Sequence, residues 1–204
     1  MKKKYIEDLK EIKDIMNRSS RFISLSGLSG ISAGITALIG AYMAHKFIFA
    51  GNDYLIFGSL ILTPEQFSKL LIIACATIVV SISLVIFLTT QEIKKKKQKI
   101  WDQQTKRILL NLSIPLLAGG IISMMFLVRG YVGIVLPMTL IFYGMALVNV
   151  SKYTLNEIRS LGLIEILLGL LSLQLVGYGL IIWSIGFGVL HIVYGFIIKM
   201  KYKS

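Results

Sequence analysis

Glu165 and His191 are the residues of this chain whose types and spacing could support chemistry, because both lie inside long apolar stretches. Each stands 13 positions from a turn centred at residue 178. In an antiparallel helix pair, residues equidistant from the turn lie at the same depth. An ionisable group inside a membrane is costly unless it is paired, so the spacing predicts an intramembrane polar pair.

The pair has two interpretations. Histidine titrates near neutral pH, which suggests a proton-responsive or ion-coupled site. A structural hydrogen bond between helices, worth about 0.6 kcal/mol on average, is the simpler alternative. We favour the structural interpretation, because ion-coupled transporters usually carry more intramembrane charge than this chain does. The rotation of the two helices decides whether the side chains face each other.

The elements that must hold these residues are six apolar segments. Of the 204 residues, 55% are hydrophobic, and the mean hydropathy is +0.77. About 20 helical residues cross a bilayer core, whereas a membrane β-barrel would show alternating polarity. The sequence therefore predicts an all-α polytopic membrane protein. Its expected spans are 22–44, 70–90, 108–128, 131–150, 161–176 and 178–198.

The segments outside the spans are short. We expect a cytoplasmic amphipathic helix within residues 1–21, a transmembrane domain over 22–198 and a cytoplasmic tail at 199–204. The apolar face of the first helix consists of Tyr5, Leu9, Ile12 and Met16. Its polar face is mainly acidic, unlike that of a helix lying on anionic lipid. Residues 5–16 therefore pack on the bundle itself, which we favour, or bind a protein partner.

Basic residues fall on one side of the predicted spans. Only Lys46, Lys69 and Arg129 of the 22 Lys and Arg residues lie on the other side. Cytoplasmic segments retain Lys and Arg, so both termini are expected in the cytoplasm, beside an anionic inner leaflet. This placement accounts for the net charge of +12 without nucleic acid.

The first span carries a heptad of small residues. Close backbone contact between small residues holds membrane helices together, so this seam should be the tightest helix contact. An intramolecular contact is favoured over a dimer because five other helices are available; the oligomeric state is left open. The seam consists of Gly27, Gly30, Gly34, Ala37, Ala41 and Ala44.

Other polar positions give local expectations. Asn111 and Asn149 are equidistant from a turn at Gly130 and lie near the cytoplasmic ends, where water can satisfy them. Pro115 should kink its helix and free a carbonyl group. Cys75, the only cysteine, is expected to be a small core residue.

Two helix starts carry the pattern of a capping box, in which Ser or Thr is followed three residues later by Glu or Gln. Thr63 and Gln66 form one such pair, and Thr154 and Glu157 the other. The apolar run 54–62 is too short to span a bilayer, so we expect it to lie in the outer interface or to re-enter the membrane as cover.

Enzyme motifs are missing. The two histidines, His45 and His191, lie far apart, and the chain contains no HExxH, GxSxG or Walker sequence. We therefore expect no enzyme activity, no metal site and no cofactor.

Five stretches of the chain resemble an uncharacterised family of bacterial polytopic inner-membrane proteins. They are YIEDLKEIK (5–13), SSRFISLSGLSG (19–30), QTKR (104–107), KYTLNEIRSLGLIE (152–165) and HIVYG (191–195). The resemblance implies a location in the bacterial inner membrane, and it implies no activity or ligand.

The sequence thus favours an accessory or interaction protein that uses residues 5–16 and the basic connection 91–107. The alternative is a small solute or ion transporter built on two helical hairpins, with Glu165 and His191 at the pathway.

Overall fold

The computed structural model describes residues 9, 27–49, 62–95, 101 and 103–202. In these residues every regular element is helical. The expected amphipathic helix at 5–16 and the outer segment 54–62 lie largely outside them. The elements are α2 (Gly27–Ala44), the π-helix η1 (His45–Phe49), α3 (Pro64–Lys95), α4 (Gln103–Val128), α5 (Val132–Val150), α6 (Asn156–Gln174), the 3₁₀ turn η2 (Val176–Tyr178), α7 (Gly179–Trp183), the π-helix η3 (Ser184–Leu190) and α8 (His191–Lys201).

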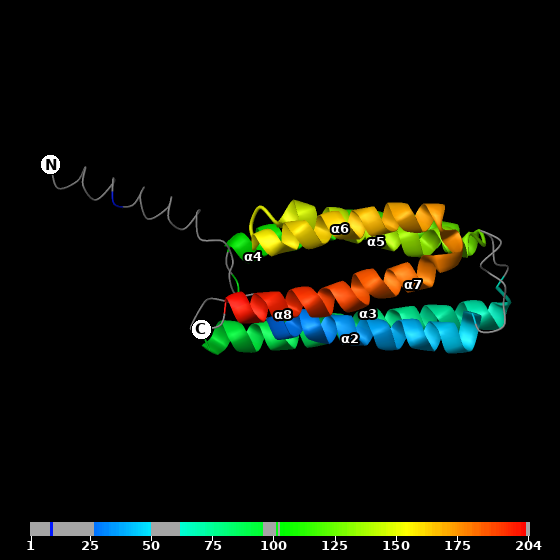
Figure 1. The fold of residues 1–204 in the computed structure, drawn as a ribbon, viewed down its shortest axis with the longest axis horizontal. Coiled ribbons are helices and arrows are strands. Elements are labelled where there is room, and N and C mark those ends of the chain that lie inside the picture. The colour runs from blue at the N-terminus through cyan, green and yellow to red at the C-terminus, as the bar shows by residue number, and fades with distance from the viewer. Residues whose placement is uncertain (1–8, 10–26, 50–61, 96–100, 102, 203–204) are drawn as a thin grey trace.

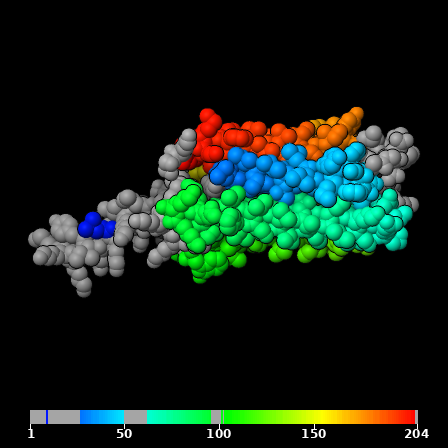
Figure 2. Space-filling view, turned by 90° about the horizontal axis from the view of Figure 1, so that it is seen from below, coloured from blue at the N-terminus to red at the C-terminus, as the bar shows by residue number. Residues whose placement is uncertain are grey.

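The helices form two layers (Figure 1). One layer contains α4, α5 and α6, and the other contains α2, α3 and α8. The segment α7–η3 crosses from the first layer to the second, and α2 lies between α3 and α8 (Figure 2). The last helix, α8, therefore packs against α2, the first helix whose bounds the structure describes.

Five helical segments among the described residues are long and apolar enough to cross a membrane: Gly27–Phe49, Pro64–Lys95, Gln103–Val128, Val132–Val150 and Val176–Lys201. They correspond to five of the six predicted spans. The sixth, α6, is present as a helix beside α5, but it carries Glu157, Arg159 and Glu165 and is less apolar. The described residues are thus all-helical and contain several helices that could cross a membrane, while the membrane location and six crossings remain predictions.

The glycines of α2 face α8 at very close range. A Cβ atom added to Gly27 would lie 2.4 Å from the carbonyl oxygen of Gly195, and one added to Gly34 would lie 2.5 Å from that of Gly188. A Cβ atom added to Gly30 would have slightly more room, since its nearest neighbour, the Gly195 Cα atom, would lie 3.2 Å away. The structure therefore places the glycines of the predicted seam in an intramolecular contact.

The alanines at the other end of α2 are also buried. Ala44 joins Ile48, Phe49, Leu127 and Val132 in a core cluster that connects α2–η1 to α4 and α5. The two layers are therefore held together at this end by large apolar side chains.

A second close contact joins α5 to α6. Cβ atoms added to Gly144 and Gly162 would lie 2.6 and 2.7 Å from each other's carbonyl oxygens. This reciprocal pair lets the two backbones approach, as small residues do in membrane bundles.

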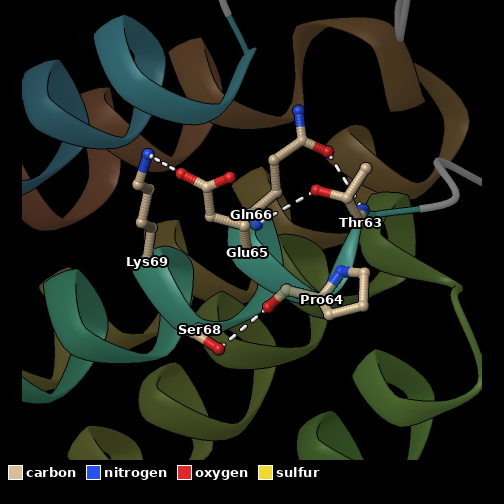
Figure 3. A network of polar contacts seen from close by, with 6 residues as sticks. All are labelled: Thr63, Pro64, Glu65, Gln66, Ser68 and Lys69. Atoms are coloured by element: carbon tan, nitrogen blue, oxygen red, sulfur yellow. Dashed lines mark hydrogen bonds and ion pairs between the residues drawn. The ribbon is translucent and has the colours of Figure 1, made fainter.

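The predicted capping box at Thr63 is confirmed (Figure 3). The Thr63 N–H donates to Gln66 Oε1 at 3.1 Å, and the Gln66 N–H donates to Thr63 Oγ1 at 3.2 Å. Pro64 occupies the first helical position, where its missing N–H costs nothing. On the next turn Lys69 pairs with Glu65 at 2.7 Å.

The second predicted capping box is wrong. Thr154 donates back to the Val150 carbonyl at 3.3 Å, and α6 begins at Asn156 without a side-chain cap. Glu157 instead accepts hydrogen bonds from Lys201 Nζ at 2.5 Å and from the Tyr202 hydroxyl at 3.3 Å. A contact with the end of α8 has replaced the local cap.

This contact gives a pH-dependent prediction. Partial burial of Glu157 raises its pKa, but the hydrogen bonds from Lys201 and Tyr202 and the charge of Lys201 outweigh burial, so the pKa lies below its ordinary 4.5. A lowered folded-state pKa adds stability above the ordinary value, which is lost as the pH falls through the folded-state pKa. Melting temperatures in detergent should therefore fall less steeply below pH 4.5 for Glu157→Gln than for the wild type. Lys201→Gln should reproduce this change, and identical pH profiles for Glu157→Gln and the wild type would contradict the prediction.

Two further expectations need correction. Cys75 is exposed on α3 and is not a core residue. In α3, Ile93 is the buried residue, and most other apolar side chains point outward, toward the space that lipid would fill. The antiparallel pair expected about the turn at residue 178 is also packed only in part: α6 contacts α7 and η3, whereas α8 packs on α2 and reaches α6 through large side chains.

Candidate functional site

The two layers meet in the middle of the bundle at a buried glutamate. Glu165 lies on the face of α6 that points toward η3 and α8, and its side chain is 0% exposed. His191 begins α8 and is 7% exposed. The distance from His191 Nδ1 to Glu165 Oε1 is 3.5 Å. The structure therefore brings the two sequence-predicted residues together.

Both ring nitrogens of His191 have partners. Nδ1 lies 3.0 Å from the Gly186 carbonyl oxygen, and Nε2 lies 2.7 Å from the Tyr143 hydroxyl. A carbonyl oxygen only accepts, so Nδ1 carries a proton and donates it to Gly186. In the neutral ring Nε2 then accepts from the Tyr143 hydroxyl, which fixes the tautomer.

Glu165 has no such partners. Neither Oε1 nor Oε2 has a hydrogen-bond partner among the described residues. The 3.5 Å to His191 is longer than an ordinary N–H···O hydrogen bond of about 2.7–3.2 Å. Buried polar groups are nearly always hydrogen-bonded, and an exception calls for an explanation.

The π-helix η3 shapes the site. Its residue Gly186 lies so close to Glu165 that an added Cβ would stand 2.5 Å from Oε2 and 2.6 Å from the Leu140 side chain. His191 follows five positions after Gly186, and its ring binds the Gly186 carbonyl. Short π-helical segments inside α-helices are frequent at functional sites. Here the segment brings an imidazole and a backbone carbonyl to the carboxyl group.

Aromatic rings close the site on the side of α5. Phe187 packs against Tyr143 and Trp183, with ring centroids 4.8 Å away in each case, and it stacks on His191 at 5.9 Å. Trp183 Nε1 donates to Thr139 Oγ1 at 3.1 Å. The rings cover the imidazole and position its hydroxyl partner.

Ser123 and Ser172 are also buried, and their hydroxyl oxygens have no partner among the described residues. Ser172 lies seven positions after Glu165, on the same face of α6, next to Gly179. Besides Glu165, the bundle thus buries two further polar groups, one on α4 and one on α6.

Asn149 and Asn111 meet across α4 and α5. Asn149 Nδ2 donates to the Asn111 backbone carbonyl at 3.1 Å, while Asn111 Nδ2 donates to the Arg107 carbonyl. Pro115 lacks the N–H that would bind the carbonyl four residues earlier, which is that of Asn111. The predicted freed carbonyl is thus satisfied by a neighbouring helix, and water is not needed for Asn149.

Tyr143 and Gly186 are the site residues that sequence reasoning missed. Tyrosine in membrane proteins gathers at the interfaces, so a tyrosine well inside the span 131–150 was a usable signal. No sequence pattern pointed to Gly186, because its role depends on which helix lies opposite it.

The described residues contain no group of three or more His, Cys, Asp and Glu side chains that could hold a metal ion. Comparison of the chain with protein-family models, with curated proteins and with solved structures finds no significant match.

Proposed function

We propose that this protein is an accessory or interaction protein of the bacterial cytoplasmic membrane that meets its partner at one end of the bundle. The supporting observation is a strongly basic end. The ends of α3 and α8, the start of α4 and the α5–α6 connection lie together there (Figure 1). Exposed basic residues at this end are Lys94, Lys95, Lys106, Arg107, Lys152, Arg159, Lys199 and Lys201.

The opposite end of the bundle has far fewer exposed basic residues. Its exposed basic side chains in the described residues are Lys46, Lys69 and Arg129, and Lys69 is paired with Glu65. An excess of Lys and Arg marks the cytoplasmic side of a membrane protein, so we place the basic end in the cytoplasm. Each cation beside an anionic leaflet contributes about 1 kcal/mol of attraction.

The enclosed interior also supports this role. A transporter holds its substrate site near the midplane and opens it to each side in turn. Glu165 and the neighbouring Leu140 are 0% exposed, His191 is 7% exposed, and Gly186 packs directly against the carboxyl group. A solidly packed centre fits a protein that binds others through its surface.

Photo-cross-linking in intact membranes tests the proposal. A photoreactive amino acid placed at Lys152 or Lys199, both at the basic end, should give the same dominant adduct. Matched substitutions at Lys69 and Arg129, exposed basic residues of the other end, should give none. The charge reversal Lys94→Glu with Lys95→Glu should weaken the adduct. Equal adduct patterns from both ends, or no protein adduct from the basic end, would contradict the proposal.

Transport is the second candidate, and the unpartnered carboxyl group of Glu165 favours it. Ionisable residues within membrane spans often mark ion or substrate pathways, and η3 interrupts the last helix beside the carboxyl group. Labelling of Leu140→Cys by a membrane-impermeant thiol reagent, in a chain carrying Cys75→Ser, would favour transport over the accessory role.

A further inference from the structure

We propose that Tyr143, His191 and Glu165 form a proton relay, in which His191 passes protons between the Tyr143 hydroxyl and the Glu165 carboxyl group. The ligand of this site is the proton, delivered by hydronium from water. The relay is independent of the accessory role, because it depends only on groups inside the bundle.

The first observation is the order of the groups. The Tyr143 hydroxyl binds one side of the imidazole at 2.7 Å, and Glu165 Oε1 faces the other side at 3.5 Å. An imidazole can accept a proton at one nitrogen while releasing one from the other. The three side chains come from α5, α8 and α6, so the tertiary structure has aligned a donor, a carrier and an acceptor.

The second observation is that the carboxyl group of Glu165, the acceptor of the relay, can form hydrogen bonds that it does not make in the structure. Glu165 is fully buried, and both of its oxygens lack a hydrogen-bond partner among the described residues. A purely structural glutamate would be expected to use them. A carboxyl group that gains and loses a proton needs an oxygen free to receive it.

The proton balance follows from these contacts. Nε2 takes the proton of the Tyr143 hydroxyl while Nδ1 gives its proton to Glu165 Oε1. Tyr143 recovers a proton from hydronium, which leaves as water, so the net change is one carboxylate converted to one carboxylic acid, with the imidazole proton moved from Nδ1 to Nε2. The reverse steps release the proton. The 3.5 Å gap must shorten by about 0.5 Å to reach hydrogen-bond distance, and such contacts are often long in a resting structure.

The charged and titratable surroundings are few. His191 faces Glu165 from α8 and Tyr143 of α5 binds the far side of the His191 ring, while η3 contributes the backbone of Gly186. On α6 itself, Glu157 lies about 12 Å further along the helix axis and is engaged by Lys201 and Tyr202. Tyr143 packs against the apolar cluster of Leu147, Leu155, Ile158, Leu161 and Ile198 near the basic end.

Infrared difference spectroscopy of the purified full-length protein tests the relay. Acidification of the wild type should produce a C=O stretching band of a buried protonated carboxyl group. Glu165→Gln should abolish this band, whereas the matched control Glu157→Gln, at the surface end of the same helix, should retain it. After a rapid pH jump, Tyr143→Phe should form the band with full amplitude but about 10²-fold more slowly, since a positioned proton-transfer group contributes roughly 10²–10⁴-fold.

Tyr143→Phe removes one hydroxyl group and keeps the ring, so it decides the question even if Glu165→Gln does not fold. An unchanged rate in Tyr143→Phe would overturn the relay. A band that persists in folded Glu165→Gln, or a wild type in which no buried carboxyl group titrates, would overturn the assignment of Glu165 as the proton acceptor. A band that responds to sodium ions and not to pH would also overturn the proposal.

Discussion

Replacement of His191 by alanine is expected to lower the free energy of unfolding by about 3–5 kcal/mol, the range for truncating a large buried ring. The change empties the contact between the two layers, where the His191 ring lies 5.4 Å from the Tyr143 ring of α5. It also leaves the Tyr143 hydroxyl and the Gly186 carbonyl without their partner, and an unsatisfied buried group costs about 1–3 kcal/mol. Reversible unfolding in mixed micelles measures the effect.

His45 provides the matched control. It is the other histidine of the chain, and it is exposed in η1. His45→Ala should change the free energy of unfolding by no more than about 0.5 kcal/mol. Similar losses in the two variants would show that the contacts of His191 do not matter for stability.

A double-mutant cycle with Glu165→Gln measures the interaction across the 3.5 Å contact. Residues in direct contact show coupling energies of about 0.5–3 kcal/mol, whereas independent sites are additive. Additive effects of Glu165→Gln and His191→Ala would argue against a functional pair.

Replacement of Gly34 by alanine is expected to destabilise the bundle by about 1–3 kcal/mol, the usual cost of overpacking. The new methyl group would meet the Gly188 carbonyl oxygen at 2.5 Å and the Ile192 backbone nitrogen at 3.0 Å. Backbone atoms cannot rotate away as a side chain can, so α2 and α8 must separate. The melting temperature in detergent reports the change.

Gly120 on α4 is the matched control, because nothing lies within 4 Å of an added Cβ atom there. Alanine favours a helix over glycine by about 1 kcal/mol, so Gly120→Ala should leave the protein equally stable or more stable. The structure also predicts a milder effect for Gly30→Ala, where the nearest atom is at 3.2 Å. A Gly34→Ala variant as stable as Gly120→Ala would refute the close contact.

The features that could be predicted from the sequence are those set by neighbours along the chain. Apolar length predicted the helices that are long enough to cross a membrane, and the Thr63–Gln66 spacing predicted the start of α3, because both features are set within one helix. The depth of Glu165 and His191 also followed from counting residues on either side of a turn.

The wrong predictions concern contacts between a residue and other helices. Thr154 and Glu157 have the spacing of a capping box, but Lys201 and Tyr202 offered Glu157 a contact with more hydrogen bonds. Cys75 is small and apolar enough for a core, yet among the described residues no helix covers its side chain, which is exposed. In both cases the outcome depends on how helices far apart in the sequence pack together.

The sequence by itself predicted an all-helical chain with several helices long and apolar enough to cross a membrane, the asymmetric placement of its charges and the common depth of Glu165 and His191. Hydrophobic length and residue counting suffice for these, since they act along one helix axis. Only the tertiary structure decided that α8 packs on α2, that η3 brings Gly186 against Glu165, and that Tyr143 completes the site. Those facts depend on helix rotation and on close packing between glycines, which a pattern of residue types along one chain does not specify.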